Sequence, residues 1–314
     1  MASHTHFFKA GLILSALLLS STVNSKEING FELDGALIPA NQIFSGGPEK
    51  DGIPAIDNPK FIKIRAASFM KDSDRVLGIT INGASKAYPI KILNWHEIVN
   101  DSIADVSFAI TYCPLCGTGI AFDSNINGQI LNFGVSGLLY NSDVLLYDRE
   151  TGSLWSQLLS KAVTGNHKAT DLKPLPTIHT TWANWKQLQP SSLVLSTETG
   201  YKRSYSKSPY SGYERSRDLY FPVTNKAPAR YHPKEKVLGL TLGKKNKAYP
   251  FIELNKNNKT LLTDIVNETS LTIHWNKKEQ TGYITDEQGT IIATVQSYWF
   301  AWYAFHPDTD VFIK

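Results

Sequence analysis

The chain has only two cysteines, Cys113 and Cys116, and the run around them is Cys113-Pro114-Leu115-Cys116-Gly117. Such a run between two strands is typical of a metal knuckle, in which the turn directs two thiolates at one ion. Because there is no second cysteine pair, a zinc site with four thiolates is excluded. We therefore expect a histidine to complete any metal site.

His96 is the candidate third ligand, since it lies beside Trp95 and Glu97 shortly before the strand that leads to Cys113. Two thiolates and one imidazole would form an open site suited to copper(I) or zinc. Glu97 or Asp143 is expected as a fourth ligand or as a group that hydrogen-bonds the ligands. Three other histidines lie in polar sequence and are interpreted as surface residues: His167, His179 and His232.

Two other functions remain open for the same cysteines. Cys113 and Cys116 could cycle between dithiol and disulfide in a thiol-disulfide oxidoreductase, although Gly117-Thr118-Gly119 opposes the helix that usually follows a redox pair. Alternatively, they form an inert disulfide in a module that recognises a glycan or peptide through aromatic residues such as Trp155 and Tyr213. Whether the protein is an enzyme is left open.

The elements expected to position the thiols are two strands. Val106, Phe108, Ile110 and Tyr112 alternate with small or polar residues, which is the period of a half-buried strand. Residues 120–122 are apolar and read as a returning strand. The cysteines are therefore predicted at the tip of a hairpin, where glycine allows a sharp reversal.

An internal repeat organises the rest of the chain. Residues 76–89 align with residues 237–250, and eight of the fourteen positions are identical. The thiols and the histidine do not recur in the second copy, which indicates that one copy kept a site and the other a structural role. Helical periodicity is scarce outside a short helix expected at residues 182–189, so the predicted fold is β-rich α+β, built from duplicated strand and hairpin units in one large domain or two packed β subdomains.

The predicted segments follow from composition. Residues 1–25 carry one lysine and a short apolar run, which is typical of a secretory signal peptide. A turn-rich lead-in is expected at 26–60, a first repeat with the cysteine and histidine site at 61–225, and a second, degenerate repeat at 226–314. We expect a periplasmic protein with no transmembrane anchor in the mature chain.

Composition and missing motifs also restrict the partners. The formal charge is +4 without a basic run, so nucleic acid is not expected. The chain has no phosphate-binding loop and no dinucleotide fingerprint, so no nucleotide cofactor is expected. The expected partners are a copper or zinc ion and a periplasmic redox partner, with a role in metal handling or metal-dependent redox chemistry.

Four motifs resemble the DUF3179 family of exported bacterial and archaeal proteins, whose role is undefined; they lie at residues 94–101, 111–118, 136–143 and 147–157. The resemblance covers most of the chain after the signal peptide. It implies that one set of residues belongs together, namely His96, Cys113, Cys116, Tyr140, Asn141, Asp143 and Trp155. We expect Tyr140, Asn141, Asp143 and Trp155 to line or support the metal site.

Overall fold

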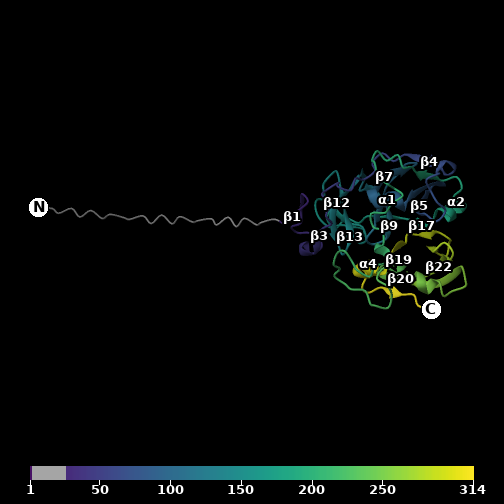
Figure 1. The fold of residues 1–314 in the computed structure, drawn as a ribbon. Helices are drawn as coiled ribbons and strands as arrows, with labels where there is room; N and C mark the ends of the chain where they lie inside the picture. The colour runs from purple at the N-terminus through teal and green to yellow at the C-terminus, as the bar shows by residue number, and fades with distance from the viewer. Residues whose placement is uncertain (2–25) are drawn as a thin grey trace.

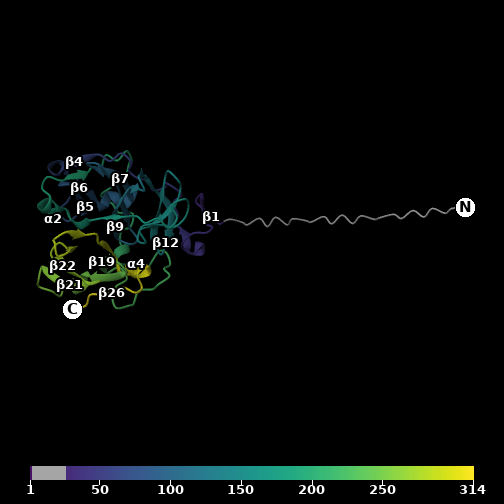
Figure 2. The ribbon, with the colours of Figure 1, turned by 180° about the vertical axis from the view of Figure 1, so that it is seen from behind.

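The computed structural model describes Met1 and residues 26–314 (Figures 1 and 2). The rest of the predicted signal peptide lies outside the described residues. Of the described residues, 41% are in strands and 12% in helices, which confirms the predicted β-rich α+β fold. Within the described part, no helix combines the length and the hydropathy needed to cross a bilayer.

The predicted repeat is visible as one order of elements that occurs twice. The first copy contains β5 (Arg75–Ile81), β6 (Ala84–Pro89), α1 (Ile90–His96), β7 (Ile98–Ile103), β8 (Val106–Cys113) and β9 (Thr118–Asp123). The second contains β19 (Lys236–Leu242), β20 (Lys245–Pro250), α3 (Phe251–Leu254), β21 (Leu261–Val266), β22 (Thr269–Asn276) and β23 (Thr281–Thr285). Strand register repeats too, because Leu77 pairs with Tyr88 and Leu238 pairs with Tyr249.

The repeat extends further than the sequence alignment indicated. The first copy continues with β17 (Thr177–Thr181), α2 (Trp182–Leu188) and β18 (Leu193–Leu195), and the second with β25 (Val295–Tyr298), α4 (Trp299–Phe305) and β26 (Asp310–Val311). Strand β17 pairs with β5 as β25 pairs with β19, and β18 and β26 each pair in parallel with the second strand of their copy. The predicted helix at 182–189 is confirmed as α2.

An insertion separates β9 from β17 in the first copy only. It contains β10 (Asn125–Ile126), β11 (Gln129–Ile130), β12 (Phe133–Tyr140), β13 (Asp143–Asp148), β14 (Leu154–Ser156), β15 (Lys161–Ala162) and β16 (Pro174–Leu175). The second copy has only the short β24 (Ile291–Ile292) in the corresponding place. The insertion therefore adds a sheet to the copy that carries the cysteines.

The lead-in is part of the folded body. It contributes β1 (Glu27–Ile28), β2 (Phe31–Glu32), β3 (Ile43–Ser45) and a 3₁₀ helix at Ala40–Gln42, and β3 extends the sheet of the insertion in the order β15-β14-β13-β12-β3. Strand β4 (Phe61–Lys63) is followed by a 3₁₀ helix at Ile64–Ala66 and closes the sheet β17-β5-β6-β18-β4. The boundaries at residues 60 and 225 stay predictions.

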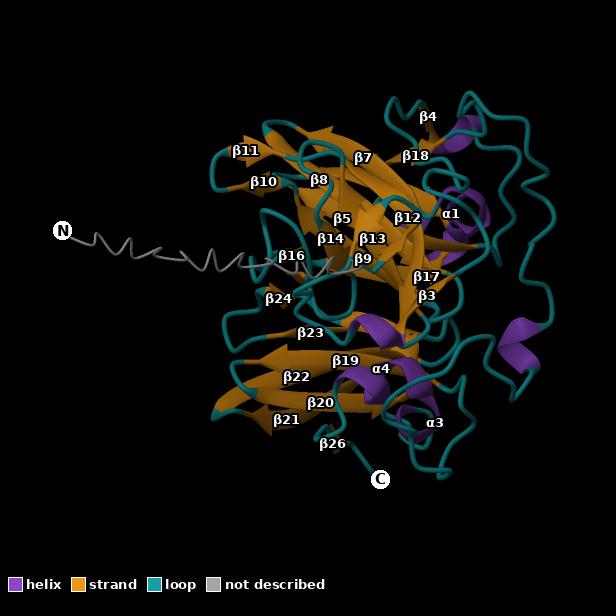
Figure 3. Cartoon of the chain, turned by 90° about the vertical axis from the view of Figure 1, so that its left-hand side faces the viewer, coloured by secondary structure: helices purple, strands orange, loops and turns teal. Residues whose placement is uncertain are grey.

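The two copies are joined through a shared sheet. Strand β25 pairs with β9, which gives the order β26-β20-β19-β25-β9-β8-β7, and β16 also pairs with β9. Strands β21 to β24 form a separate sheet. In Figure 3 the strands of the second copy, such as β19, β20 and β22, lie below those of the first. Because the sheet is continuous, the copies pack as one body rather than as separate domains.

Strand β8 is buried on both faces, which differs from the half-buried strand expected. Phe108 and Ile110 face one hydrophobic cluster, which also contains Leu77 and Tyr88. Ala109 and Cys113 face another, which is built largely from the insertion. Alternate residues of β8 therefore face two different cores, and neither face meets solvent. The reason is that the insertion covers the face that a single sheet would expose.

Candidate metal centre

The cysteines lie in a tight hairpin, as predicted. Strand β8 ends at Cys113, β9 begins at Thr118, and these two residues pair across the turn. Gly117 has a φ of +62°, and a Cβ there would lie 2.9 Å from the ring of Tyr298. The backbone amide of Tyr298 donates to the carbonyl of Cys116 at 2.8 Å. Glycine is therefore required at this position by both backbone conformation and space.

Both thiols are free, buried and directed at one backbone oxygen. The exposed fraction is 1% for Cys113 and 0% for Cys116. The sulfur of Cys116 donates to the carbonyl oxygen of Ser142 at 3.3 Å, and that of Cys113 lies 3.7 Å from the same oxygen. Ligand atoms around a tetrahedral zinc ion stand about 3.6 Å apart, given its usual bond lengths. The distance from each sulfur to this oxygen is therefore close to that between two ligands of one ion.

The turn that supplies this oxygen belongs to the insertion. Asn141 and Ser142 connect β12 to β13 with φ values of 52° and 64°, which is the signature of a type I′ hairpin turn. The Ser142 hydroxyl donates to the carbonyl of Phe221 at 2.7 Å, and the amide of Thr224 donates to Asn141 Oδ1 at 2.7 Å. These bonds hold the turn in place above the thiols.

Asp143 completes a group of three possible metal ligands. One ligand atom each from Cys113, Cys116 and Asp143 lie within 4.8 Å of one another, and all three residues are buried. Asp143 Oδ2 accepts a hydrogen bond from the amide of Leu158 at 2.9 Å. Its Oδ1 is buried and has no partner with full hydrogen-bond geometry, although both thiols lie close enough to lower the pKa of the carboxyl. A buried, unpartnered carboxylate oxygen is costly, and a bound cation is one way to satisfy it.

The electrostatics of the group favour protons in the absence of a cation. Burial raises the pKa of the Asp143 carboxyl to about 7, against the hydrogen bonds that lower it. Burial likewise raises the pKa of the Cys113 thiol, and it raises that of Cys116 well above the ordinary value. Thiols of this kind are poor nucleophiles as they stand. A metal ion would provide the positive charge that lets them ionise.

Glu97 lies beside this group in an adjoining cavity. It follows α1 with a φ of 57°, and the Tyr210 hydroxyl donates to its Oε1 at 3.3 Å. Burial raises the pKa of the Glu97 carboxyl to about 8. The cavity measures about 260 Å³, and its wall contains Glu97, Cys113 and mainly apolar side chains such as Leu115 and Phe221. The cavity therefore leads to Cys113 rather than to Cys116.

His96 does not belong to the group of close ligand atoms. Its Nδ1 donates to the carbonyl of Pro54 at 2.8 Å, so the neutral ring accepts at Nε2 from the Tyr205 hydroxyl, which is 2.7 Å away. Burial lowers the pKa of the ring, which favours this neutral form. Both nitrogens are thus used to anchor other segments. His96 as a ligand stays a prediction, and the geometry offers Asp143 in its place.

The two predicted aromatic residues make their contacts outside the group of ligand atoms. Tyr140 packs edge-on against Phe305, with ring centroids 5.6 Å apart. Trp155 is fully buried in the core that also holds both cysteines, and its indole donates to Asp148 Oδ2 at 2.8 Å. Neither residue supplies a ligand atom to the group. The interpretation of His179 as a surface residue was wrong, since it is 9% exposed on β17.

The sequence reasoning missed the carbonyl of Ser142, because a backbone oxygen leaves no mark in residue type. Tyr213, which the sequence suggested only for glycan or peptide recognition, shares the core with the cysteines and has a buried hydroxyl without a hydrogen-bond partner. The signal that could have pointed to Ser142 is the Asn141-Ser142 pair between two apolar runs, which is a turn pattern.

A pH dependence follows from the two raised carboxyl pKa values. In the folded, metal-free protein Asp143 and Glu97 keep their protons up to about pH 7 and about pH 8. In the unfolded chain both carboxyls lose their protons near the ordinary carboxyl pKa of about 4. The folded state binds more protons in this window, so the free energy of unfolding should fall as pH rises from about 4 to about 8.

Urea unfolding with a chelator at a series of pH values measures this slope. Asp143→Asn and Glu97→Gln should each flatten it, because each variant removes one titrating carboxyl. An unchanged slope in both variants would show that these carboxyls are not protonated in the folded state.

Comparison with known proteins agrees with the motifs. A family model described as a protein of unknown function (DUF3179) matches residues 50–309. No curated protein and no solved structure matches the chain. The match spans both copies of the repeat, the insertion and all residues of the candidate centre. The chain therefore belongs to the DUF3179 family.

Proposed function

We propose that this is an exported protein that binds one soft metal ion, copper or zinc, through Cys113, Cys116 and Asp143. The observation that carries the proposal is the Asp143 carboxylate oxygen, which is buried without a partner beside two free, buried thiols. A cation at this point would satisfy the oxygen and both sulfurs together. Thiolates select copper(I) and zinc, and the carboxylate suits zinc better than copper(I).

The repeat supports this assignment. Cys113 and Thr118 pair across the first hairpin as Asn276 and Thr281 pair across the second, so Asn276 stands where Cys113 would be. The second copy also lacks the insertion that carries Asp143. The thiols and the segment that completes their environment therefore occur together in one copy and are absent together from the other.

The donor set leaves a position for a further ligand. Zinc sites that act on substrates keep one of four positions open, whereas structural sites fill all four with protein ligands. The cavity of about 260 Å³ beside Cys113 gives that position a place, and Glu97 lies in its wall. This arrangement suits metal handling or metal-dependent redox chemistry better than a purely structural ion.

A thiol-disulfide oxidoreductase is the second candidate, and Asp143 favours it as well. A buried carboxyl with a pKa of about 7 can take the proton of a neighbouring thiol. Cys113, which lines the cavity, would attack the disulfide of a partner protein and release one partner thiol. Cys116 would then attack the mixed disulfide, leaving a Cys113–Cys116 disulfide and a reduced partner.

The recognition alternative gains no support from its aromatic residues. Trp155 is fully buried and Tyr213 is 3% exposed, so neither offers a free surface for a glycan or peptide.

Elemental analysis of untagged protein from periplasm, with a count of free thiols, separates the candidates. One equivalent of copper or zinc with two protected thiols supports the metal proposal. A complete disulfide without metal would reject it and favour the oxidoreductase.

The choice between Asp143 and His96 as third ligand is tested by two matched amide variants. Asp143→Asn should weaken metal binding by about tenfold or more, since the anionic ligand is lost. His96→Asn should lower stability, because the anchors to Pro54 and Tyr205 are lost, while the metal affinity of the folded protein stays the same. Competition with a chromophoric chelator measures both affinities. The reverse ranking would restore His96 as the ligand.

A further inference from the structure

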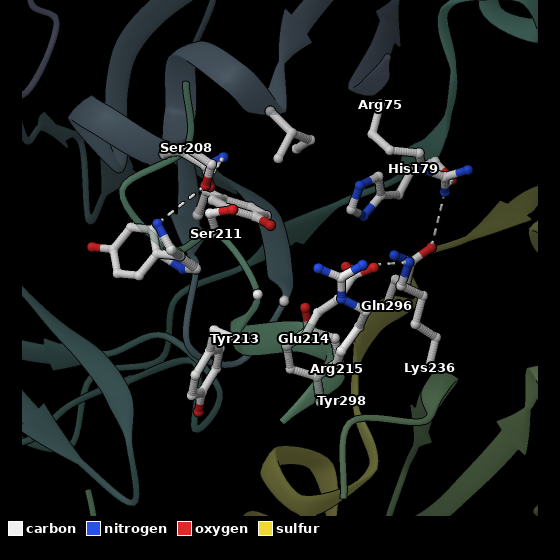
Figure 4. A pocket seen from close by; sticks show the side chains of 17 residues that line it. Arg75, His179, Ser208, Ser211, Tyr213, Glu214, Arg215, Lys236, Gln296 and Tyr298 are labelled. Carbon is white, nitrogen blue, oxygen red and sulfur yellow. Dashed lines mark hydrogen bonds and ion pairs between the residues drawn. The ribbon is translucent and has the colours of Figure 1, made fainter. Parts of the chain in front are cut away.

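A second cavity, of about 310 Å³, lies where the two copies of the repeat meet (Figure 4). Arg75 begins β5 and Lys236 begins β19, so the two cations occupy equivalent positions of the repeat. His179 of β17 and Gln296 of β25 are equivalent in the same way, and all four side chains line one wall. The 3₁₀ helix Tyr213–Arg215 lines another part of the cavity.

The charge of this cavity is positive. Arg75, Arg215 and Lys236 line it against a single carboxylate, that of Glu214. Lys236 Nζ lies 3.9 Å from Glu214 Oε2, and both groups are partly exposed, so this pair is weak. The Glu279 and Glu214 carboxylates both act on Arg75 and offset part of this charge. Basic groups still outnumber acidic groups in the wall, and a concave site concentrates their field.

Polar atoms without hydrogen-bond partners occur in the same wall. The Arg75 guanidinium donates to the carbonyls of His179 and Glu279 at 2.7 and 2.8 Å and to Gln296 Oε1 at 3.3 Å. Its Nε is buried without a partner, and so is Nδ1 of His179. Buried polar atoms are nearly always paired in native proteins. Both atoms belong to side chains of one cavity wall, so this wall carries polar groups that the protein itself does not satisfy.

The remaining wall is aromatic. Tyr112 is 7% exposed and Tyr298 is 6% exposed. With Tyr210 and Tyr213 they give the cavity flat apolar surfaces. Cavities of this size that combine aromatic walls with a few convergent polar groups are typical of small-molecule sites. Inorganic ions would leave the aromatic surface uncovered, so an organic ligand fits better.

We propose that this cavity binds a small organic dianion, either a phosphate monoester or a dicarboxylate, between Arg75, Arg215 and Lys236. An anionic ligand would balance the excess of basic over acidic groups in the wall. The site is distinct from the metal centre, since neither cysteine lines it, although Pro114 and Gly117 of the hairpin do. It also does not depend on the proposed metal, because every group that would hold the ligand is on the protein.

Isothermal titration calorimetry with phenyl phosphate and with succinate tests the proposal, and the two probes distinguish the two sources of charge. Benzyl alcohol and succinamide serve as uncharged counterparts. We expect one of the dianions to bind, with affinity that falls as salt is added, and its uncharged counterpart not to bind. Absence of binding by both dianions would overturn the proposal.

Lys236→Gln and Arg215→Gln should each lower the affinity about tenfold, which is the usual loss for a charge-assisted hydrogen bond. The matched controls are Lys244→Gln, in the exposed hairpin of the second copy, and Arg217→Gln, two residues from Arg215. They have the same net charge as the test variants, but neither residue lines the cavity. Equal losses in these controls would mean nonspecific attraction and would also overturn the proposal. Arg75 is left unchanged, because it holds the carbonyl of Glu279. Metal content, measured on the same samples, keeps this result separate from the metal proposal.

Discussion

If the proposed function holds, replacing Cys113 and Cys116 together with serine should abolish metal binding, and this is the largest functional effect that we expect of any substitution. Serine keeps the size and the hydrogen-bonding capacity of the side chain but does not ionise at neutral pH. Changes in groups that only support metal ligands typically cost 10–100-fold in affinity (roughly). Loss of both thiolates should exceed that range, so no copper or zinc should remain with the purified protein.

The matched control uses the repeat. Asn276 and Glu279 take the places of the two cysteines in the second hairpin, which has the same pairing and the same loop length. Asn276→Ser with Glu279→Ser alters an equivalent turn and should leave the metal content unchanged. Competition with a chelator gives the metal affinity of each variant, and elemental analysis gives its metal content. Metal that stays bound in the double cysteine variant would place the site elsewhere in the molecule.

The hairpin could be predicted because its signals are local. Alternating residues before Cys113 and glycines after Cys116 specify two strands and a reversal, and β8 and β9 have these bounds to within two residues. The core of the repeat could also be predicted, since residues 76–89 recur with the same strand register. In both cases the information lies within a few residues of the feature that it determines.

The sequence named Asp143 as a possible fourth ligand, but its place beside the thiols could not be derived from local signals. Asp143 reaches the thiols because β12 and β13 of the insertion fold over β8, and this packing depends on contacts between residues far apart in the chain. His96 seemed suitable because it is close in sequence to the strand that bears Cys113. Its ring is instead directed at Pro54 and Tyr205, which no local pattern specifies.

The last units of the repeat were missed although a signal was present. Trp182 and Trp185 in α2 have counterparts in Trp299 and Trp302 of α4 at the same spacing, and a proline follows each pair. Few other positions of these segments match, so an alignment based on identity stops before them. The second tryptophan of each pair packs against one glycine of its copy, Trp185 against Gly78 and Trp302 against Gly239.

That contact gives the largest expected effect on stability. A Cβ at Gly78 would lie 2.2 Å from the ring of Trp185, and a Cβ at Gly239 would lie 2.3 Å from the ring of Trp302. Both rings are nearly fully buried, and each indole N–H donates a hydrogen bond at 3.0 Å, to Ser192 or to Thr309. The rings therefore cannot move aside without disturbing close-packed surroundings.

Gly78→Ala and Gly239→Ala should each lower the free energy of unfolding by about 3 kcal/mol, at the upper end of the usual cost of overpacking. Urea unfolding measures this. A double-mutant cycle with Trp185→Phe isolates the clash, because the smaller ring leaves room for the methyl group. Gly78→Ala should therefore lower the free energy of unfolding by less in the Trp185→Phe background. Additive costs would mean that the indole does not rest on the glycine. Since neither glycine contacts the cysteines, metal content per folded molecule should stay constant in all of these variants, which separates the stability of the repeat from the chemistry of the site.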